Sequence, residues 1–453
     1  MMATMFLVVL AQRPTSPADT TGGRPCTVEI DSVRGKAQQV EVRTGETNVF
    51  AGGGVFAHCR GTGSSLQSDS VAWYAGVGRF DMIGQKNLVH IRDTAITLDA
   101  VTAAYFLRQE RLEAHKNVVA VNRNSGSVLR GPNLTYYRAL KGVRDTLEMY
   151  ATGRPTIDYR GSADSAEPYV IVADRVRFKG NDRMWGGGAV TIDRSDFAAR
   201  GDSMQLDQVV GFGLLVGKPR VEGKGTESYT LTGTRIELGL RGHDIRLVKA
   251  LGDGVATGAD WRLTADTIHL HVDRKKLQQA FAWGPKDSVH ARAVSSNTTI
   301  RADSLALDVP DQVLTEVRAF GHALSTMKRD STARRDSTPD WITGDSLTAH
   351  WAQEADPPHS AQPKSRLRHL VSRGSARVLT HQYNQRDSLP SVNYSRGAKI
   401  DITLAAGKVD RVFVTGRADG VQLEPAPPDT TKKQPSDTTK KAADTKKPKA
   451  PVR

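Results

Sequence analysis

The sequence predicts an all-β fold, an elongated β-jellyroll or solenoid of about eleven stacked repeats made of short strands. Three observations predict it: two alternating short signatures, 41 glycines spread along the 453 residues, and an apolar fraction of only 38%. Ordinary globular domains are roughly 45–50% apolar, so a single thick core is not expected. A repeat architecture also overrides the general expectation of about 150 residues per domain.

The first signature is a small residue, usually Asp, followed by apolar residues two and four positions later, as in ADRVRF and ADSLAL. Side chains at every second position lie on one face of a strand, so this signature predicts strands with a single buried face. A weaker copy surrounds Gln38. The ten clear copies lie around Asp69, Asp99, Pro132, Asp174, Asp202, Thr234, Asp266, Asp303, Asp345 and Ala398.

The second signature has the pattern apolar-x-Ala-x-Gly-x-small-x-aliphatic and is clearest in MYATGRPTI and VRAFGHALS. A glycine or asparagine at a fixed place in a strand marks a positive φ, a bulge or a corner, so we expect each unit to bend there. The first signature precedes its glycine by 14 to 29 residues, most often by 18. The eleven positions are Gly54, Gly84, Asn117, Gly153, Gly188, Gly217, Gly252, Gly284, Gly321, Gly374 and Gly416.

Units with one apolar face bury it only by stacking, which creates a continuous apolar seam inside the repeat region. Periodicity leaves two interpretations open. The seam is a filled core, or it is a groove between two separated sheets that shields acyl chains from water at about 0.8 kcal/mol per CH₂. On the second interpretation, the candidate lipid-binding residues are Val71, Trp73, Leu134, Tyr136, Val176, Phe178, Met204, Leu206, Ile236, Leu238, Ile268, Leu270, Leu305, Leu307, Leu347, Ile400 and Ile402.

The strands ADRVRF and GDSLTAHW, the run GGGAVTI and the stretch GAKIDITLAAGKVDRVFVTGRADGV resemble the OstA-like (organic-solvent-tolerance, N-terminal) repeat family. The resemblance covers residues 27–425. The family includes a periplasmic lipopolysaccharide-transport protein and the periplasmic domain of an outer-membrane assembly protein. The chain is longer than an ordinary periplasmic module of this family, and it lacks the alternating segment that the barrel of the assembly protein would need.

The resemblance implies a β-jellyroll whose V-shaped interior holds the acyl chains of lipopolysaccharide. It also implies end-to-end strand pairing with like modules of an inner-membrane ATP-driven exporter and of an outer-membrane translocon. Unpaired backbone groups at an uncapped end make such pairing physically reasonable. The expected function is a periplasmic lipid-binding module that shields and passes lipopolysaccharide or a related amphipathic lipid between the two membranes. The alternative is a repetitive envelope scaffold protein with a filled core.

The two ends of the chain differ from the repeat region. Residues 1–25 begin with MMATMFLVVLAQ, which is apolar but lacks a basic start, and predict a truncated secretion signal and a linker. Residues 426–453 repeat an Asp-Thr-Lys-Lys theme and are expected to be disordered. The expected location is the periplasm, and association with the outer membrane stays open. Cys26 and Cys59 are spaced wrongly for zinc, and a single periplasmic disulfide stays open.

Basic residues exceed acidic ones, giving a net charge of +14. They are scattered and do not cluster beside aromatic residues, so no nucleic acid is expected as a partner. From residue 424 onward, seven Lys and one Arg face three Asp and one Glu, which contributes +4 of the excess. The remaining positive charge, in the repeat region, either favours anionic partners such as phosphorylated lipid headgroups or belongs to a solvated surface. Two polar stretches, 327–340 and 352–366, interrupt the repeat and are expected to be surface insertions.

Elongated β-helices also carry polysaccharide-degrading enzymes, which need convergent carboxylates. Here the acidic residues recur once per unit at turn positions, with no doubled Asp inside a strand, so no enzymatic activity is expected. His269 and His271 point the same way from one strand, but no third metal ligand is evident nearby. GKGTES at 223–228 is not a phosphate-binding loop, and no cofactor is expected.

Overall fold

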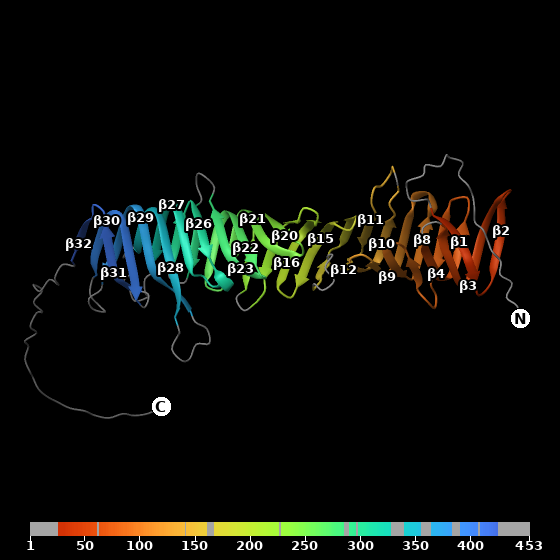
Figure 1. Cartoon of the computed structure of the whole chain (residues 1–453), viewed down its shortest axis with the longest axis horizontal. Helices are drawn as coiled ribbons and strands as arrows, with labels where there is room; N and C mark the ends of the chain where they lie inside the picture. The colour runs from red at the N-terminus through yellow and green to blue at the C-terminus, as the bar shows by residue number, and fades with distance from the viewer. Residues whose placement is uncertain are drawn as a thin grey trace, which may run out of the picture.

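A computed structural model describes residues 26–60, 63–140, 142–160, 167–225, 228–284, 290–295, 298–327, 339–354, 364–382, 390–405 and 408–424. These residues form a long rod whose 32 strands join in one hydrogen-bonded network (Figure 1). Its only helical segments are the 3-10 turns η1 (Leu107–Gln109) and η2 (Pro310–Gln312), so none of the described helices could cross a membrane. The predicted elongated all-β fold is confirmed.

The strands are short where the chain turns at both of their ends and long where one strand runs through a bend. In chain order they are β1 (Thr27–Val33), β2 (Ala37–Arg43), β3 (Glu46–Arg60), β4 (Ser64–Tyr74), β5 (Arg79–Ile83), β6 (Val89–Arg92), β7 (Ile96–Ala100), β8 (Thr102–Phe106), β9 (Arg111–Asn122), β10 (Val128–Tyr137), β11 (Glu148–Thr152), β12 (Thr156–Tyr159), β13 (Tyr169–Val172), β14 (Arg175–Lys179), β15 (Arg183–Arg194), β16 (Phe197–Asp207), β17 (Phe212–Val216), β18 (Arg220–Gly223), β19 (Tyr229–Thr232), β20 (Arg235–Arg241), β21 (Asp244–Thr257), β22 (Trp261–Asp273), β23 (Lys276–Trp283), β24 (Ala291–Ser295), β25 (Thr298–Ala302), β26 (Ser304–Asp308), β27 (Glu316–Met327), β28 (Asp340–Glu354), β29 (Lys364–Gln382), β30 (Ser391–Ala405), β31 (Lys408–Thr415) and β32 (Asp419–Leu423).

The antiparallel pairing divides the rod into two layers. Layer 1 contains β5, β8, β11, β14, β17, β20, β23, β26, the end strands β2 and β31, and one half of every long strand. Layer 2 contains β1, β6, β7, β12, β13, β18, β19, β24, β25, β32 and the other halves. The long strand β15, for example, pairs with β14 in layer 1 through residues 183–187 and with β13 in layer 2 through residues 191–193.

One repeat is a hairpin in layer 1 followed by a hairpin in layer 2. After Asp174 the chain runs through β14 and the first half of β15, bends at Gly188, and continues in layer 2 until it returns at Asp202. The Asp and Gly signatures are therefore the two corners of each repeat. All corners lie on one side of the rod, the corner side, and the hairpin turns of both layers lie on the other, the turn side.

The glycine corner needs both a left-handed backbone and a missing side chain. Gly188 and Gly321 have φ values of 80° and 74°, and a Cβ on either would overlap the carboxylate of the preceding corner residue, Asp174 or Asp303. The amide of each Asp donates a 2.9 Å hydrogen bond to the carbonyl oxygen of its glycine. Nine of the eleven predicted bend positions have positive φ, and Gly84 and Gly284 do not; the nine are Gly54, Asn117, Gly153, Gly188, Gly217, Gly252, Gly321, Gly374 and Gly416.

The strand pattern defines the two expected insertions more closely. The strands extend into both interruptions, because Met327 pairs with Asp340 and Glu354 pairs with Lys364. The ends of the predicted insertions at 327–340 and 352–366 therefore belong to strands. Their remaining parts, 328–338 and 355–363, lie outside the described residues.

The two ends of the rod are unlike its middle. At the N-terminal end β1 and β2 each pair with β3 alone, and at the C-terminal end β31 and β32 each pair with β30 alone, within the part of the chain that the structure describes. Val40, Val42, Val421 and Leu423 are exposed on these end strands. The predicted signal and linker at 1–25 and the predicted disordered tail at 426–453 lie outside the described residues.

Candidate functional site

All of the predicted lipid-binding residues lie in layer 1 and point toward the interior. They are 0–9% exposed and belong to one apolar cluster that runs from Cys26 to Leu404. The strands that carry them are β4, β10, β14, β16, β20, β22, β26, β28 and β30, so every repeat except those at Gln38 and Asp99 contributes to the same inner face. The structure thus brings these residues together along the seam, and contact with a lipid stays a prediction.

The opposite wall of the seam is layer 2, which the list of candidate residues missed. A signal for it was present, because the aliphatic residue four positions after the corner glycine points inward from layer 2, as Ile157, Ile192, Val221 and Val378 do. Buried layer 2 residues include Val55, Ala57, Ile96, Leu98, Ala120, Leu129, Ile157, Ile171, Ile192, Ala199, Val221, Leu231, Ala256, Leu263, Ile300, Ile342 and Val378.

In the described part of the chain, three cavities with mainly apolar linings lie in the seam between the layers, and a fourth, lined largely by charged residues, lies between Phe197 and Ile245. Cavity 1 has a volume of about 550 Å³ including its mouth and is lined by Phe80, Met82 and Tyr136 of layer 1 and by Val28 and Ile96 of layer 2, among others. Cavity 2, about 450 Å³, lies between Phe178 and Ile157. Cavity 3, about 510 Å³, lies between Leu206 and Ile171. Their order follows the order of the repeats along the rod.

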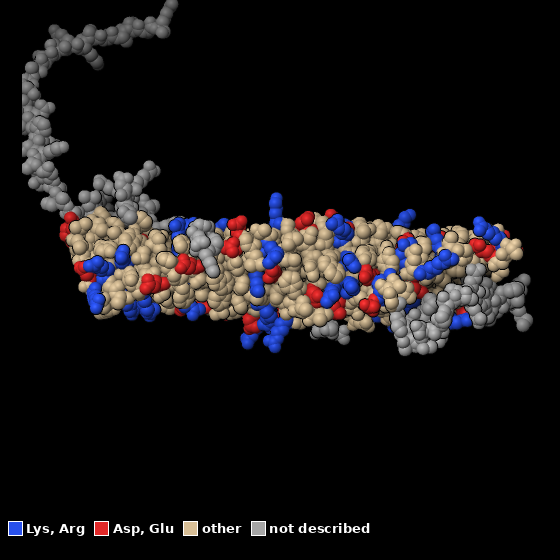
Figure 2. Space-filling view, turned by 90° about the horizontal axis from the view of Figure 1, so that it is seen from above, with Lys and Arg blue, Asp and Glu red and all other residues tan. Residues whose placement is uncertain are grey.

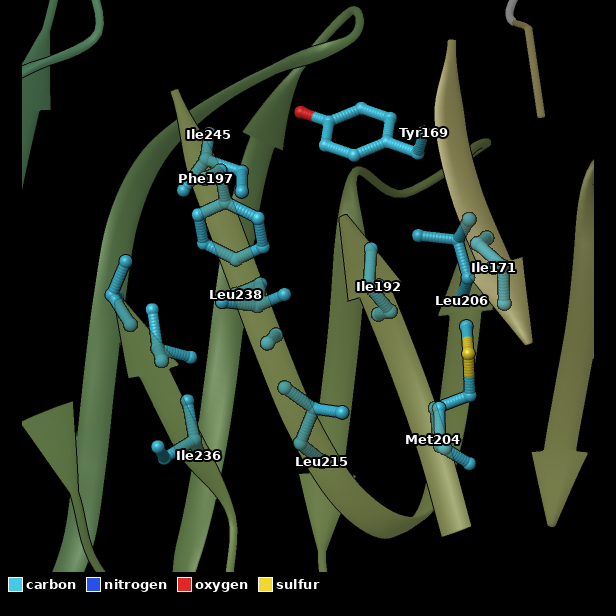
Figure 3. Packing of buried hydrophobic residues seen from close by; sticks show 14 of the residues in the cluster. Tyr169, Ile171, Ile192, Phe197, Met204, Leu206, Leu215, Ile236, Leu238 and Ile245 are labelled. Carbon is cyan, nitrogen blue, oxygen red and sulfur yellow. The ribbon is translucent and has the colours of Figure 1, made fainter. Parts of the chain in front are cut away.

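At cavity 3 the side chains of layer 1 and layer 2 can be seen facing each other across the seam (Figure 3). Met204, Leu206, Leu215 and Leu238 extend from layer 1, and Tyr169, Ile171, Ile192 and Phe197 extend from layer 2. Tyr169 and Phe197 meet edge to face, with ring centroids 6.3 Å apart. Four predicted residues, Met204, Leu206, Leu238 and Phe178, thus line cavities 2 and 3 directly.

A polar bridge joins the two layers at the mouth of each cavity. At cavity 2, the amide of Asn122 in layer 2 donates a 2.9 Å hydrogen bond to the side-chain oxygen of Asn181 in a layer 1 turn. At cavity 3, the hydroxyl of Tyr169 donates a 2.9 Å hydrogen bond to the carbonyl oxygen of His243. The third bridge, at cavity 1, is ionic. The seam is therefore closed along the turn side at three points by side chains.

The ionic bridge at cavity 1 contains two buried carboxylates. Asp93 and Glu110 are 5% and 3% exposed. Arg138 lies between them, with Nε 3.3 Å from Oδ2 of Asp93 and Nη1 3.5 Å from Oε2 of Glu110. The hydroxyl of Tyr136 donates a 3.0 Å hydrogen bond to Oδ2 of Asp93, and that of Tyr105 donates to Oε2 of Glu110.

The environment keeps the donors of this cluster protonated. Burial and the carboxylates of Glu110 and Asp93 raise the pKa of the Tyr105 and Tyr136 hydroxyls far above the usual range. Burial alone would lower the pKa of Arg138, but the negative charge of Asp93 and the other nearby acidic groups outweighs it and raises that pKa. Tyr105, Tyr136 and Arg138 therefore keep their protons and remain donors at neutral pH.

No sequence signature pointed to this cluster. Its acidic residues do lie singly in turns, as expected, but the fold brings the two turns together, so the premise that acidic side chains do not converge is wrong for Asp93 and Glu110. His269 and His271 lie on the outer face of layer 1, where their rings contact Trp283 and Phe281. The described residues contain no group of three or more His, Cys, Asp or Glu arranged to hold a metal ion.

The sequence left open whether the two cysteines form a disulfide, and the structure shows that they do. Cys26 and Cys59 form a disulfide, with their Cα atoms 5.1 Å apart, and it joins the start of β1 to the end of β3 in layer 2. Cys59 also lines cavity 1.

The outer surface carries mixed charge. Figure 2 shows Lys and Arg side chains interspersed with Asp and Glu along the visible face of the rod. Many of these residues form ion pairs, either across neighbouring strands, as Arg396 does with Asp419, or along one strand, as Arg235 does with Glu237. Exposed pairs of this kind typically add only about 0–1 kcal/mol each to stability.

Comparison with protein-family models gives no match for this chain, and comparison with curated proteins gives none either. The function is therefore argued from the seam, its cavities and the residue pattern.

Proposed function

We propose that this chain is a lipid-binding module that shields the acyl chains of lipopolysaccharide or a related amphipathic lipid inside its seam and passes them along the rod. The observation that carries the proposal is the row of three cavities between the layers, each lined mainly by apolar side chains from both walls.

The energetics favour an aliphatic occupant. Each CH₂ group moved from water into an apolar site gains about 0.8 kcal/mol, so a chain that reaches through neighbouring cavities gains in proportion to its buried length. The polar bridges stand at the mouths of the cavities, where a headgroup would meet water. No covalent step is needed, and the proposed role is not enzymatic.

The proposed setting is the periplasm, in line with the resemblance to OstA-like repeats, and association with the outer membrane is part of this proposal. The free edges of β1 and β2 at one end, and of β31 and β32 at the other, support end-to-end strand pairing with like modules. By the same resemblance, those modules belong to an inner-membrane ATP-driven exporter and an outer-membrane translocon. Nucleic acid is not a proposed partner.

A second candidate, an envelope scaffold with a filled core, is favoured by the C-terminal half of the seam. There the seven predicted residues are only 0–2% exposed, as in a continuous buried core. They are Ile268, Leu270, Leu305, Leu307, Leu347, Ile400 and Ile402.

Binding to whole and to deacylated lipopolysaccharide tests the proposal. Comigration of the protein with the intact lipid in gel filtration, and not with the deacylated form, is expected because the seam offers contacts only to acyl chains. Leu238→Trp should reduce binding by filling cavity 3, whereas Glu237→Trp, which adds the same side chain to the outer face, should bind as well as the unmodified protein. Equal binding of both lipid forms, or no effect of Leu238→Trp, would favour the scaffold.

A further inference from the structure

The bridge at cavity 1 differs from the other two in the number of bonds that cross between the layers. Arg138 and Tyr136 reach from layer 1 to Asp93 in a layer 2 turn. In the opposite direction, the backbone amide of Cys26 at the start of layer 2 donates a 2.9 Å hydrogen bond to Oε1 of Glu110 in a layer 1 turn. Three bonds thus join the layers here, compared with a single neutral hydrogen bond at cavity 2 and at cavity 3.

Every carboxylate oxygen of this bridge already has a donor. The hydroxyl of Ser64 donates a 2.6 Å bond to Oδ1 of Asp93, and Tyr136 and Arg138 occupy Oδ2. At Glu110, Cys26 occupies Oε1, while Tyr105 and Arg138 occupy Oε2. A buried polar network whose groups all have hydrogen-bond partners is rigid and leaves no polar group free to bind a ligand.

Two features hold the bridge over the cavity. The disulfide fixes Cys26 to Cys59, and Cys59 lies in the cavity wall. Glu110 has a left-handed backbone, with φ of 47° and ψ of 44°, which is unfavourable for a residue other than glycine and persists only where the surroundings impose it. Here its carboxylate is bonded on both oxygens, so the turn is held in that conformation by the bridge itself.

We propose that cavity 1 is a separate, latched binding chamber for an uncharged aliphatic chain, and that the Asp93, Arg138 and Glu110 bridge is its latch. The proposal rests on the proposed function, because cavity 1 belongs to the same seam. A chain enters cavity 1 only when the two rows of turns part, whereas cavities 2 and 3 open when one neutral hydrogen bond breaks.

The chemistry of the wall selects the occupant. Phe80, Met82, Ile96 and Leu112 give cavity 1 an apolar lining, and the polar groups at its mouth bond to one another. A charged headgroup inside would have no free partner and would lose its hydration, which is strongly unfavourable. The ligand is therefore the terminal part of an acyl chain or a wholly apolar molecule, with any headgroup left outside.

Photolabelling with a diazirine-bearing fatty alcohol tests the latch in the full chain, with labelled peptides mapped by mass spectrometry. Tyr136→Phe removes one bond between the layers without changing charge, and it should raise the labelling rate around Phe80 and Met82 roughly tenfold, the effect of losing one hydrogen bond to a charged group. Ser64→Ala removes a different bond to Asp93 and should raise the rate in the same direction. Labelling at cavity 3 should not change in either variant.

A matched pair of substitutions on β4 locates the labelled site. Leu66 lies in the wall of cavity 1, and its neighbour Gln67 is exposed on the outer face. Leu66→Trp should abolish labelling at Phe80 and Met82, while Gln67→Trp should preserve it.

The outcomes separate the latch from the proposed function. Suppose that cavity 3 is labelled but that neither Tyr136→Phe nor Ser64→Ala changes the labelling rate at cavity 1. This result would overturn the latch and leave the proposed lipid binding intact. Labelling near Phe80 that persists in Leu66→Trp overturns cavity 1 as the binding chamber. Absence of label at every cavity in all variants overturns the proposed function together with the latch.

Discussion

At the corners formed by Gly188, Gly321 and Gly374, the glycine and the preceding Asp occupy a space that admits no further atoms. Gly321 combines a φ of 74° with direct contact to Asp303, whereas Gly242, in a hairpin turn, has a φ of 64° and open space where a Cβ would lie. The two glycines therefore separate the effect of backbone conformation from the effect of packing.

Alanine at these two positions should destabilise the protein by different amounts. Gly242→Ala should lower the free energy of unfolding by about 1 kcal/mol through its left-handed backbone alone. Gly321→Ala should lower it by about 1–3 kcal/mol more, because the new methyl group displaces the carboxylate of Asp303. Urea unfolding measures both, and equal losses would contradict the corner packing described here.

Asp69 stabilises its corner through its charge. Its carboxylate accepts hydrogen bonds from the backbone amides of Asn87, Lys86 and Gln85, at 2.9, 2.5 and 2.6 Å, and these donors hold its pKa well below the usual range. A lowered pKa in the folded state means that the stabilisation is present above the ordinary Asp pKa of about 3.9 and is lost as pH falls through the lower folded value.

The effect of Asp69→Asn should therefore depend on pH. The variant should have a lower Tm than the unmodified protein at pH 7, because a neutral amide binds the three backbone donors less strongly. The difference should shrink in acid as Asp69 itself becomes protonated. Thermal unfolding followed by circular dichroism over a pH series measures it, and a difference in Tm that is constant with pH would contradict the role assigned to the charge.

Leu307 reports whether the C-terminal half of the seam is filled. It is 1% exposed between the layers, so Leu307→Asp should bury an unpaired charge and lower the free energy of unfolding by about 4 kcal/mol or more. Ser304→Asp, which places the same charge on the outer face of β26, is the matched control and should change stability little. A normal unfolding transition in Leu307→Asp would show that water reaches this part of the seam.

At the scale of strands, one wall of the seam could be predicted and the other was missed for a physical reason. Layer 1 strands follow the Asp corner with apolar residues at fixed positions, so Val176 and Phe178 stood out from the sequence. Layer 2 strands follow the glycine corner with smaller residues, such as Ala323 and Ala376, which pack tightly but give a weak apolar signal.

The hairpins of the N-terminal end depend on a covalent link as well as on pairing. The disulfide closes a separation of 33 residues between β1 and β3, and such a loop restricts the unfolded chain by about 3–4 kcal/mol. Replacing Cys26 and Cys59 by Ala should lower the free energy of unfolding by that amount. Urea unfolding of the two forms measures it. Identical stability would show that the pairing of β1 with β3 is sufficient alone.

At the scale of the whole molecule, the sequence predicted a rod of stacked bent strands, because each repeat carries its own corner residues and its own apolar pair. The bridges on the turn side could not be predicted. They join residues far apart in the chain, such as Asn122 with Asn181 and Tyr169 with His243, and they lie in turns that the repeat pattern does not constrain. The cavities depend on the distance between the layers, which periodicity does not encode.

Site-specific photo-crosslinking from both walls of cavity 3 tests the central claim, that the seam between the layers holds acyl chains. Photo-leucine, a diazirine analogue of about the size of leucine that leaves the cavity open, should form adducts with the acyl chains of lipopolysaccharide when placed at Leu238 in layer 1 or at Ile171 in layer 2. The same group at the outward-facing neighbours Glu237 and Val170 should form none. Adducts from the outward positions, or none from Leu238 and Ile171 in a protein saturated with lipid, would contradict it.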